Sequence, residues 1–161
     1  NYKYLLQRYE NKREVGRGDA ISFNSIKINI IWPVLDKSKN KDECIKSYNG
    51  NVNNDSVVME FEYLGKRFLL MGDAEQDVEK VLLDKGFISS NDNYDILKAG
   101  HHCSKTSSSE TFIKLISPKL AVCSVGIDNS FGHPSGETLK TFNYLSVQYL
   151  LTYEEGNIRI K

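Results

Sequence analysis

The sequence predicts an α/β fold in which helices cover a mixed β-sheet. In its first half, runs that alternate apolar and polar residues come in pairs separated by short turns, as in β-hairpins. In its second half, short apolar runs alternate with longer segments whose apolar residues recur at helical spacing. Hairpins followed by strand–helix alternation indicate that antiparallel and parallel strands share one sheet.

Two hairpins are expected in the amino-terminal half. The predicted strands cover residues 20–23, 26–31, 56–63 and 67–71. Asn24 and Ser25 form the first turn, and Pro33 ends the second strand because proline cannot donate to the sheet. Residues 36–55 are polar and dense in Lys, Asp and Asn, which predicts a mobile loop between the two hairpins.

Strands and helices alternate in the carboxyl-terminal half. Strands are expected over residues 95–98, 120–125, 148–152 and 157–160, and helices over 75–85, 108–116 and 135–145. Glu75 and Asp77 stand early in the first of these helices and Lys85 stands late, an order that suits the helix dipole. Ser135 is placed to cap the last helix. The final two strands are expected to meet at a turn through residues 154–156.

Composition and charge exclude several classes of protein. The chain of 161 residues is 40% hydrophobic, as in a single globular domain. Its 21 basic residues balance 21 acidic ones, which excludes a strongly basic nucleic-acid coat and a polyacidic tail. Since no apolar run is long enough to span a bilayer, we expect a soluble, cytoplasmic domain, with attachment to a membrane channel left open.

The cysteines predict reduced thiols. Cys44, Cys103 and Cys123 are odd in number, widely spaced and free of any Cys-x-x-Cys pair. Neither a disulfide framework nor a thiolate zinc site is expected from this pattern. Reduced cysteines favour the cytoplasm as the compartment.

Candidate chemistry gathers after three predicted strands. All three histidines, His101, His102 and His133, follow strand ends in segments rich in Gly, Ser and Thr, and Asp73 follows another strand. Sites of open α/β sheets are built at the carboxyl edge of the strands. Carboxylate and imidazole ligands suit zinc or manganese, so the sequence predicts a metal site at this edge. The alternative is that Asp73 caps a helix and the histidines are satisfied within loops.

Four segments stand in a distinctive order: FLLMGDAE, DILKAGHHCSKTSS, PKLAVCSVGIDNSFGHPS and YLLTYEEGNIRI. This order resembles the carboxyl-terminal half of metallo-β-lactamase-fold hydrolases, and most closely the soluble domain of ComEC-type DNA-uptake channel proteins and their stand-alone relatives. The resemblance runs from about Gly18 onward. It implies an αββα sandwich, with residues 1–161 forming the carboxyl-terminal part of a single domain.

The resemblance also implies roles for individual residues. Asp73 matches the family's metal-bridging aspartate, and His133 matches its late histidine ligand. His101 and His102 match the paired catalytic histidines, one of which would contact the scissile phosphate or donate a proton. One or two ions, Zn(2+) or else Mn(2+), would activate a water for phosphodiester hydrolysis. Phosphate oxygens would be bound by Ser104, Lys105 and Thr106.

The sequence departs from the family at two places. Cys103 stands where the family has glycine, which leaves the shape of this loop open. The family's first metal-binding motif, His-x-His-x-Asp-His or His-x-x-x-Asp-His, has no match, since no histidine precedes His101. Two ligands cannot complete a catalytic zinc site, which takes three from the protein.

Two interpretations therefore stand. In one, the chain is an enzyme whose first motif lies in the amino-terminal half of the same domain, on the same or a separate chain. Its substrate would be DNA, a smaller phosphodiester or an ester. In the other, the chain is a non-catalytic binding or regulatory module that keeps the fold without a complete metal site.

Overall fold

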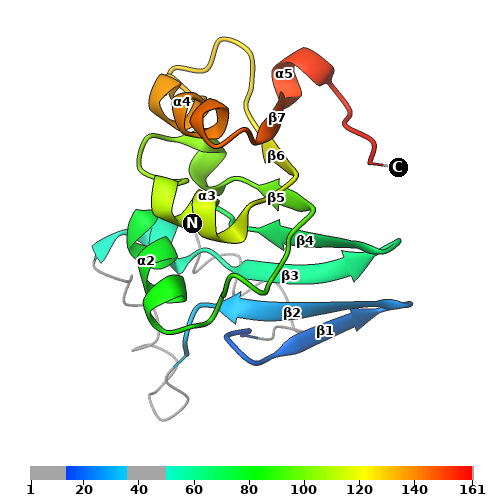
Figure 1. Ribbon diagram of the computed structural model, residues 1–161. Coiled ribbons are helices and arrows are strands. Elements are labelled where there is room, and N and C mark those ends of the chain that lie inside the picture. Colours follow the sequence, from blue (N-terminus) through cyan, green and yellow to red (C-terminus); the bar gives the residue numbers. More distant parts are fainter. Residues whose placement is uncertain (1–13, 36–49, 161) are drawn as a thin grey trace, which may run out of the picture.

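The computed structural model describes residues 14–35 and 50–160 (Figure 1). In this part, seven strands form one sheet and stand in chain order. The strands are β1 (Ala20–Phe23), β2 (Ile26–Trp32), β3 (Val58–Tyr63), β4 (Lys66–Leu70), β5 (Ile96–Lys98), β6 (Leu120–Cys123) and β7 (Gln148–Leu151). Strands β1 to β4 pair antiparallel and β4 to β7 pair parallel, which confirms the predicted mixed α/β sheet.

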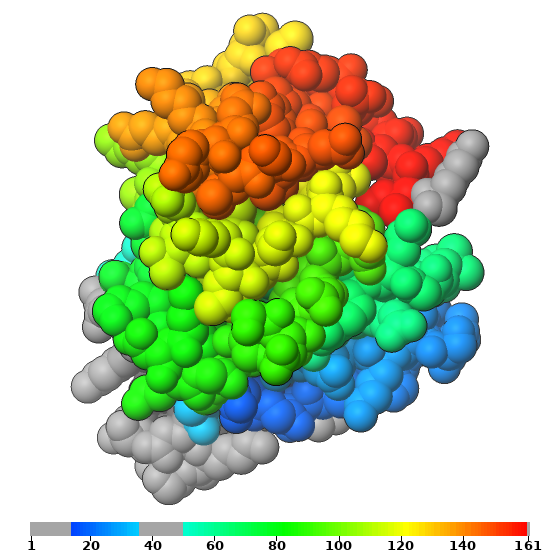
Figure 2. Space-filling model, viewed as in Figure 1, coloured from blue at the N-terminus to red at the C-terminus, as the bar shows by residue number. Residues whose placement is uncertain are grey.

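Helices cover one face of the sheet. The helical elements are η2 (Val52–Asp55), α2 (Gln76–Asp84), η3 (Gly100–Cys103), α3 (Glu110–Ile116), α4 (Gly136–Tyr144) and α5 (Thr152–Glu155). Fully buried Leu69, Leu97 and Ala121 from the central strands share one core with Val78 of α2 and Phe112 of α3. In the space-filling view, α2, α3 and α4 follow one another as a continuous layer from green to orange (Figure 2). None of the helices in the described residues has the length and apolar composition of a membrane span.

The opposite face of the sheet is apolar as well. Because side chains alternate along a strand, the neighbours of Leu69 and Leu97 point away from the helices. The stacked rings of Phe61 and Phe68, with centroids 4.7 Å apart, lie on this second face. Phe68 is paired in turn with Ile96 of β5, so these three residues form one row across the strands. The adjacent row is formed by Met59, Leu70, Lys98, Val122 and Leu150.

The chain end differs from the predicted final hairpin. After β7 the chain forms the short helix α5, and residues 157–160 adopt no regular structure. The Thr152 hydroxyl donates to the carbonyl of Val125 and accepts from its N–H, both at 2.8 Å. These bonds tie the start of α5 to the loop after β6, so the chain does not return along β7.

Only the last residues of the predicted loop over 36–55 belong to the part of the chain that the structure describes. Residues 36–49 lie outside the described residues. Residues 52–55 form η2, where the side chain of Asn51 accepts from the N–H of Asn53 at 3.0 Å. Asn54 is fully buried, and its carbonyl accepts from Trp32 Nε1 at 2.7 Å. This end of the segment is therefore packed into the domain.

The prediction of reduced cysteines is wrong for Cys103 and Cys123, which form a disulfide with a Cα–Cα distance of 5.5 Å. The two lie 20 residues apart in sequence. They meet because β5 and β6 are parallel neighbours, with Lys98 opposite Val122. The chain that leaves β5 thus lies beside the end of β6. Cys44 lies outside the described residues, and the cysteines no longer argue for a reducing compartment.

Candidate functional site

The three predicted strand ends meet at one edge of the sheet. Parallel pairing of β4, β5 and β6 brings Asp73, the paired histidines and the loop that carries His133 to the same side. His102 Nε2 lies 3.4 Å from Asp73 Oδ1. The rings of His101 and His133 lie 5.4 Å apart, centroid to centroid. The structure thus places Asp73 with His102 and His133 with His101.

The contact between Asp73 and His102 is suited to a cation. His102 Nδ1 lies 2.6 Å from the carbonyl oxygen of Ser124. A carbonyl only accepts hydrogen bonds, so Nδ1 carries a hydrogen and Nε2 is the ring nitrogen that faces the carboxylate. Two electron-pair donors at this distance repel each other unless a proton or a metal ion lies between them. A ring nitrogen held by a carbonyl is also the usual arrangement of metal-binding histidines.

The turn that carries Asp73 is held from several sides. The N–H of Asp73 donates to Ser56 Oγ at 2.9 Å. Gly72 has a φ of +59°, and a Cβ there would lie 2.8 Å from Ser56 Cβ, so the turn requires glycine. Lys98 Nζ donates to the Gly72 carbonyl at 2.6 Å and lies 3.9 Å from Asp73 Oδ1. Asp73 does not cap α2, because the N-cap position is Glu75.

Lys98 brings a positive charge to the carboxylate from the second face of the sheet. Burial lowers the pKa of Lys98, and the charge of Asp73 opposes that shift without cancelling it. The ammonium and His102 thus approach the same oxygen of Asp73. The sequence shows Lys98 only as the last residue of an apolar strand, so periodicity alone does not identify it as part of the site.

Glu75 is a site residue that the sequence did not identify. Its Oε1 lies 2.9 Å from His101 Nδ1 and accepts from Asn53 Nδ2 at 3.1 Å, while Oε2 accepts from Asn51 Nδ2 at 2.8 Å. Burial raises the pKa of Glu75, but hydrogen bonds from Asn53 and Thr106 and the charge of His101 outweigh it and lower the pKa below its ordinary value. The ionised carboxylate fixes Nδ1 of His101 and leaves Nε2 for other contacts.

His133 has the character of an incompletely paired ligand. Its Nδ1 is buried and finds no hydrogen-bond partner in the described residues. Burial and the charges of His101 and His102 lower its pKa, which favours the neutral ring that metals bind. Phe131 stacks on the ring with centroids 6.0 Å apart.

The donor set fits part of a metal site. Among residues 14–35 and 50–160, no group of three His, Cys, Asp or Glu side chains is arranged to hold an ion. Asp73 and His102 supply two donors with suitable geometry. His133 supplies an imidazole that lies beside His101, and the structure does not bring it into a shared ligand group with Asp73.

The three residues predicted to bind phosphate differ in exposure. Ser104 is only 4% exposed, and its hydroxyl lies 3.1 Å from that of Thr106, so it supports the loop from inside. Lys105 and Thr106 lie at the surface. Thr106 Oγ1 lies 3.4 Å from His101 Nδ1, which places this hydroxyl beside the paired histidines.

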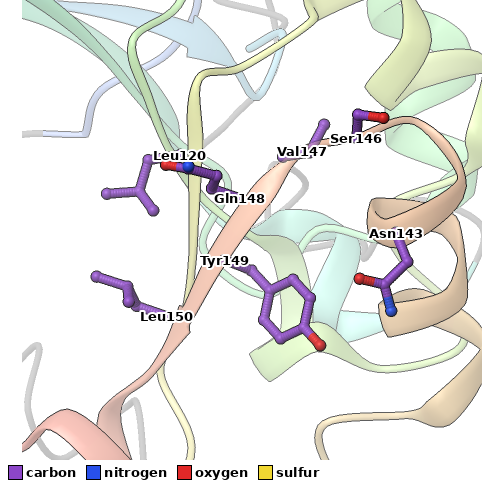
Figure 3. A pocket seen from close by; sticks show the side chains of 7 residues that line it. All are labelled: Leu120, Asn143, Ser146, Val147, Gln148, Tyr149 and Leu150. Atoms are coloured by element: carbon purple, nitrogen blue, oxygen red, sulfur yellow. The ribbon is translucent and has the colours of Figure 1, made fainter.

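A separate hollow lies near the edge strand β7 (Figure 3). Its position is at the amino ends of β6 and β7, whereas the histidines follow the carboxyl ends of the parallel strands. Its lining carries none of the imidazole and carboxylate side chains that gather at the histidine loop. The lining consists of Leu120, Asn143, Ser146, Val147, Gln148, Tyr149 and Leu150.

Comparison with known proteins gives a family match and three relatives. Residues 12–127 match the family model described as Metallo-beta-lactamase superfamily. ComE operon protein 3 of Bacillus subtilis (strain 168) is 30% identical over 148 residues, which cover 92% of this chain and 17% of that protein. Competence protein ComA of Neisseria gonorrhoeae is 36% identical over 83 residues, 52% of this chain and 12% of that protein.

A third relative is the uncharacterized protein YcaI of Escherichia coli (strain K12), 24% identical over 152 residues, which cover 94% of this chain and 18% of that protein. The chain therefore spans less than a fifth of the length of each of these three relatives.

Proposed function

Since the chain belongs to the metallo-beta-lactamase superfamily, we propose that it is the carboxyl-terminal part of a metal-dependent hydrolase that cleaves phosphodiesters. The observation that carries the proposal is the 3.4 Å approach of His102 Nε2 to Asp73 Oδ1, with the other nitrogen of the ring held by a carbonyl. The resemblance of the sequence to ComEC-type DNA-uptake channel proteins makes DNA the first substrate to test.

Asp73 and His102 would hold the ion, with zinc favoured over manganese because imidazole is a ligand. When bound, the ion would supply an activated water for hydrolysis. This assigns His102 to the metal, although the resemblance alone places it among the catalytic residues. His133 keeps its predicted role as a ligand, for which its unpaired Nδ1 in the described part of the chain is suited.

His101 would act on the substrate. Glu75 holds its Nδ1, so Nε2 is the nitrogen that would contact the phosphate or donate a proton to the leaving oxygen. Thr106, whose hydroxyl lies beside His101, and Lys105 at the surface next to it would bind phosphate oxygens. Ser104 would hold these two residues in place rather than touch the substrate.

The remaining ligands would come from the amino-terminal half of the same domain, on the same or a separate chain. The second face of the sheet supports this, because Phe61, Phe68 and their neighbours form apolar rows on the side that the described helices leave open. In a sandwich such a face is buried against a second sheet.

The test uses the full-length protein. Zinc and manganese content and the hydrolysis of bis(p-nitrophenyl) phosphate, single-stranded DNA and a phosphocholine ester are measured for wild type, Asp73→Ala and His102→Ala. Asp77→Ala is the matched control, because Asp77 is an exposed carboxylate in the first turn of α2. We expect the two site variants to lose metal and activity while the control keeps both. Unchanged metal content in Asp73→Ala would refute the ligand assignment.

A second candidate function is a binding or regulatory module without catalysis. It is favoured by one observation, the lack of a three-ligand group among the residues that the structure describes. The same experiment distinguishes the two functions. A full-length protein that binds single-stranded DNA but neither retains metal nor hydrolyses any of the three substrates would be such a module.

A further inference from the structure

Two consecutive residues of the histidine loop are fixed to two consecutive residues at the end of β6. The His102 ring donates from Nδ1 to the carbonyl of Ser124 at 2.6 Å. The next residue, Cys103, is bonded to Cys123, and both cysteines are fully buried. A hydrogen bond and a covalent bond thus hold the loop on the same short stretch of chain.

The backbone of this loop is one that side chains disfavour. His101, His102 and Cys103 have φ values of +41°, +53° and +60°, three consecutive residues in the left-handed region. Non-glycine residues occupy this region singly and at a cost. Such a conformation persists only where the surroundings over-determine it. At the third position a glycine would adopt the same angle freely, whereas Cys103 adopts it and also supplies a bond.

We propose that the Cys103–Cys123 disulfide is a positioning element of the site, which keeps the histidine loop left-handed and so holds His102 Nε2 against Asp73. Its effect on metal binding rests on the proposed function, whereas its effect on the orientation of His102 does not. When the bond is broken, the hydrogen bond from His102 to Ser124 and the backbone hydrogen bonds of His101 and Cys103 remain, but the covalent link to β6 is lost and the loop relaxes toward ordinary backbone angles.

Because both cysteines are fully buried, a dithiol reaches and opens the bond when the loop opens locally. One thiolate of the reductant attacks a cysteine sulfur, the S–S bond breaks, and the other cysteine leaves as a thiolate. The second thiol of the reductant then displaces the first cysteine and closes the reductant's own disulfide. Two electrons pass to the protein, and both cysteines end as thiols that carry the two protons released by the reductant.

Four forms of the full-length protein test the proposal: oxidised wild type, dithiol-reduced wild type, Cys123→Ser and Cys103→Gly. Thiol counts are verified by alkylation in denaturant and mass spectrometry. The first readout needs no metal: the rate at which diethylpyrocarbonate modifies His102 in chelator-treated protein, measured on the His102 peptide. The second is zinc affinity from competition with a chromophoric chelator. Circular dichroism and thermal unfolding report the fold.

We expect reduction and Cys123→Ser to raise the modification rate of His102 severalfold and to weaken zinc binding about 10- to 100-fold, the usual effect of losing a group that orients a ligand. Cys103→Gly should have the His102 modification rate and zinc affinity of the oxidised wild type, and the reductant should change neither, because glycine adopts the left-handed angle without the disulfide.

Two results would overturn the proposal. One is a reduced wild type, with its thiols verified, whose His102 reactivity and zinc affinity equal those of the oxidised form. The other is unfolding of the domain on reduction, which would make the bond a support of the fold and not of the site. If no form binds zinc, the proposed function fails, and the reactivity of His102 alone decides whether the disulfide positions the ring.

Discussion

Replacing Glu75 by glutamine should destabilise the domain although it only replaces one carboxylate oxygen by an NH₂ group. The carboxylate accepts from His101 and Asn53 at one oxygen and from Asn51 at the other, and Thr106 is a further donor. The glutamine oxygen can keep the first two partners, but its amide NH₂ then faces the NH₂ of Asn51, where the carboxylate accepted at 2.8 Å. A charge-assisted hydrogen bond becomes a donor–donor contact, and the expected loss is about 2 kcal/mol of unfolding free energy.

The assay is urea unfolding followed by circular dichroism at pH 7. With a slope of about 2 kcal/mol per molar urea, the midpoint should fall by about 1 M. Glu62→Gln, an exposed carboxylate in β3, is the control and should shift by less than about 0.5 kcal/mol. Adding Asn51→Asp to Glu75→Gln supplies an acceptor for the glutamine NH₂ and should recover most of the loss. A Glu75→Gln midpoint equal to that of wild type, or no recovery in the double variant, would refute the assigned network.

Three further predictions concern groups away from the metal ligands. Tyr94→Phe should cost about 1 kcal/mol at pH 7, since the hydroxyl donates to Glu60 at 2.7 Å. Burial and this hydrogen bond raise the pKa of Tyr94. The contribution of the Tyr94 hydroxyl to the free energy of unfolding is therefore complete below about pH 10, where an unfolded tyrosine ionises, and is lost as the pH rises further. If the difference between Tyr94→Phe and wild type did not narrow in urea titrations at alkaline pH, this reasoning would be contradicted. Glu79→Gln should cost about 2 kcal/mol in the same assay, because buried Glu79 accepts from the N–H groups of both Ser108 and Ser109 and glutamine can accept only one at comparable geometry. Leu69→Ala, at a fully buried position, should cost about 3 kcal/mol, and a cost below about 1 kcal/mol would show that the core is not packed as described.

Local patterns were enough to predict most of the sheet. Alternating apolar and polar residues predicted β1 to β4. Short apolar runs predicted β5 and β6, and segments with apolar residues at helical spacing predicted α2 to α4, all within a few residues. Ser135 caps α4 as predicted, accepting from the N–H of Thr138. The shared edge of Asp73 and the histidine loops also followed, because strand ends of a parallel sheet share an edge whatever their separation in sequence.

Interactions that depend on tertiary packing could not be predicted in this way. Glu75 is 24 residues from Asn51, and its place at the start of a helix was explained fully by the helix dipole. Cys103 and Cys123 gave no signal, since spacing alone does not show which strands become neighbours. The prediction of a strand over residues 157–160 is wrong because Thr152 bonds to the backbone of Val125, and the apolar pattern of residues 157–160 does not reveal this partner.

The order of strands in the sheet has a consequence for synthesis. Each strand from β2 to β7 pairs with the strand that precedes it in the chain, so a chain emerging from the ribosome can add every new strand to an edge that already exists. The Asp73 turn would be complete once β4 and β5 have joined. His102 can be held in place only after β6 has been made. Its ring bonds to Ser124 and the next residue, Cys103, bonds to Cys123, and both partners lie at the carboxyl end of β6. The carboxylate of the site is therefore in place before the imidazole that faces it.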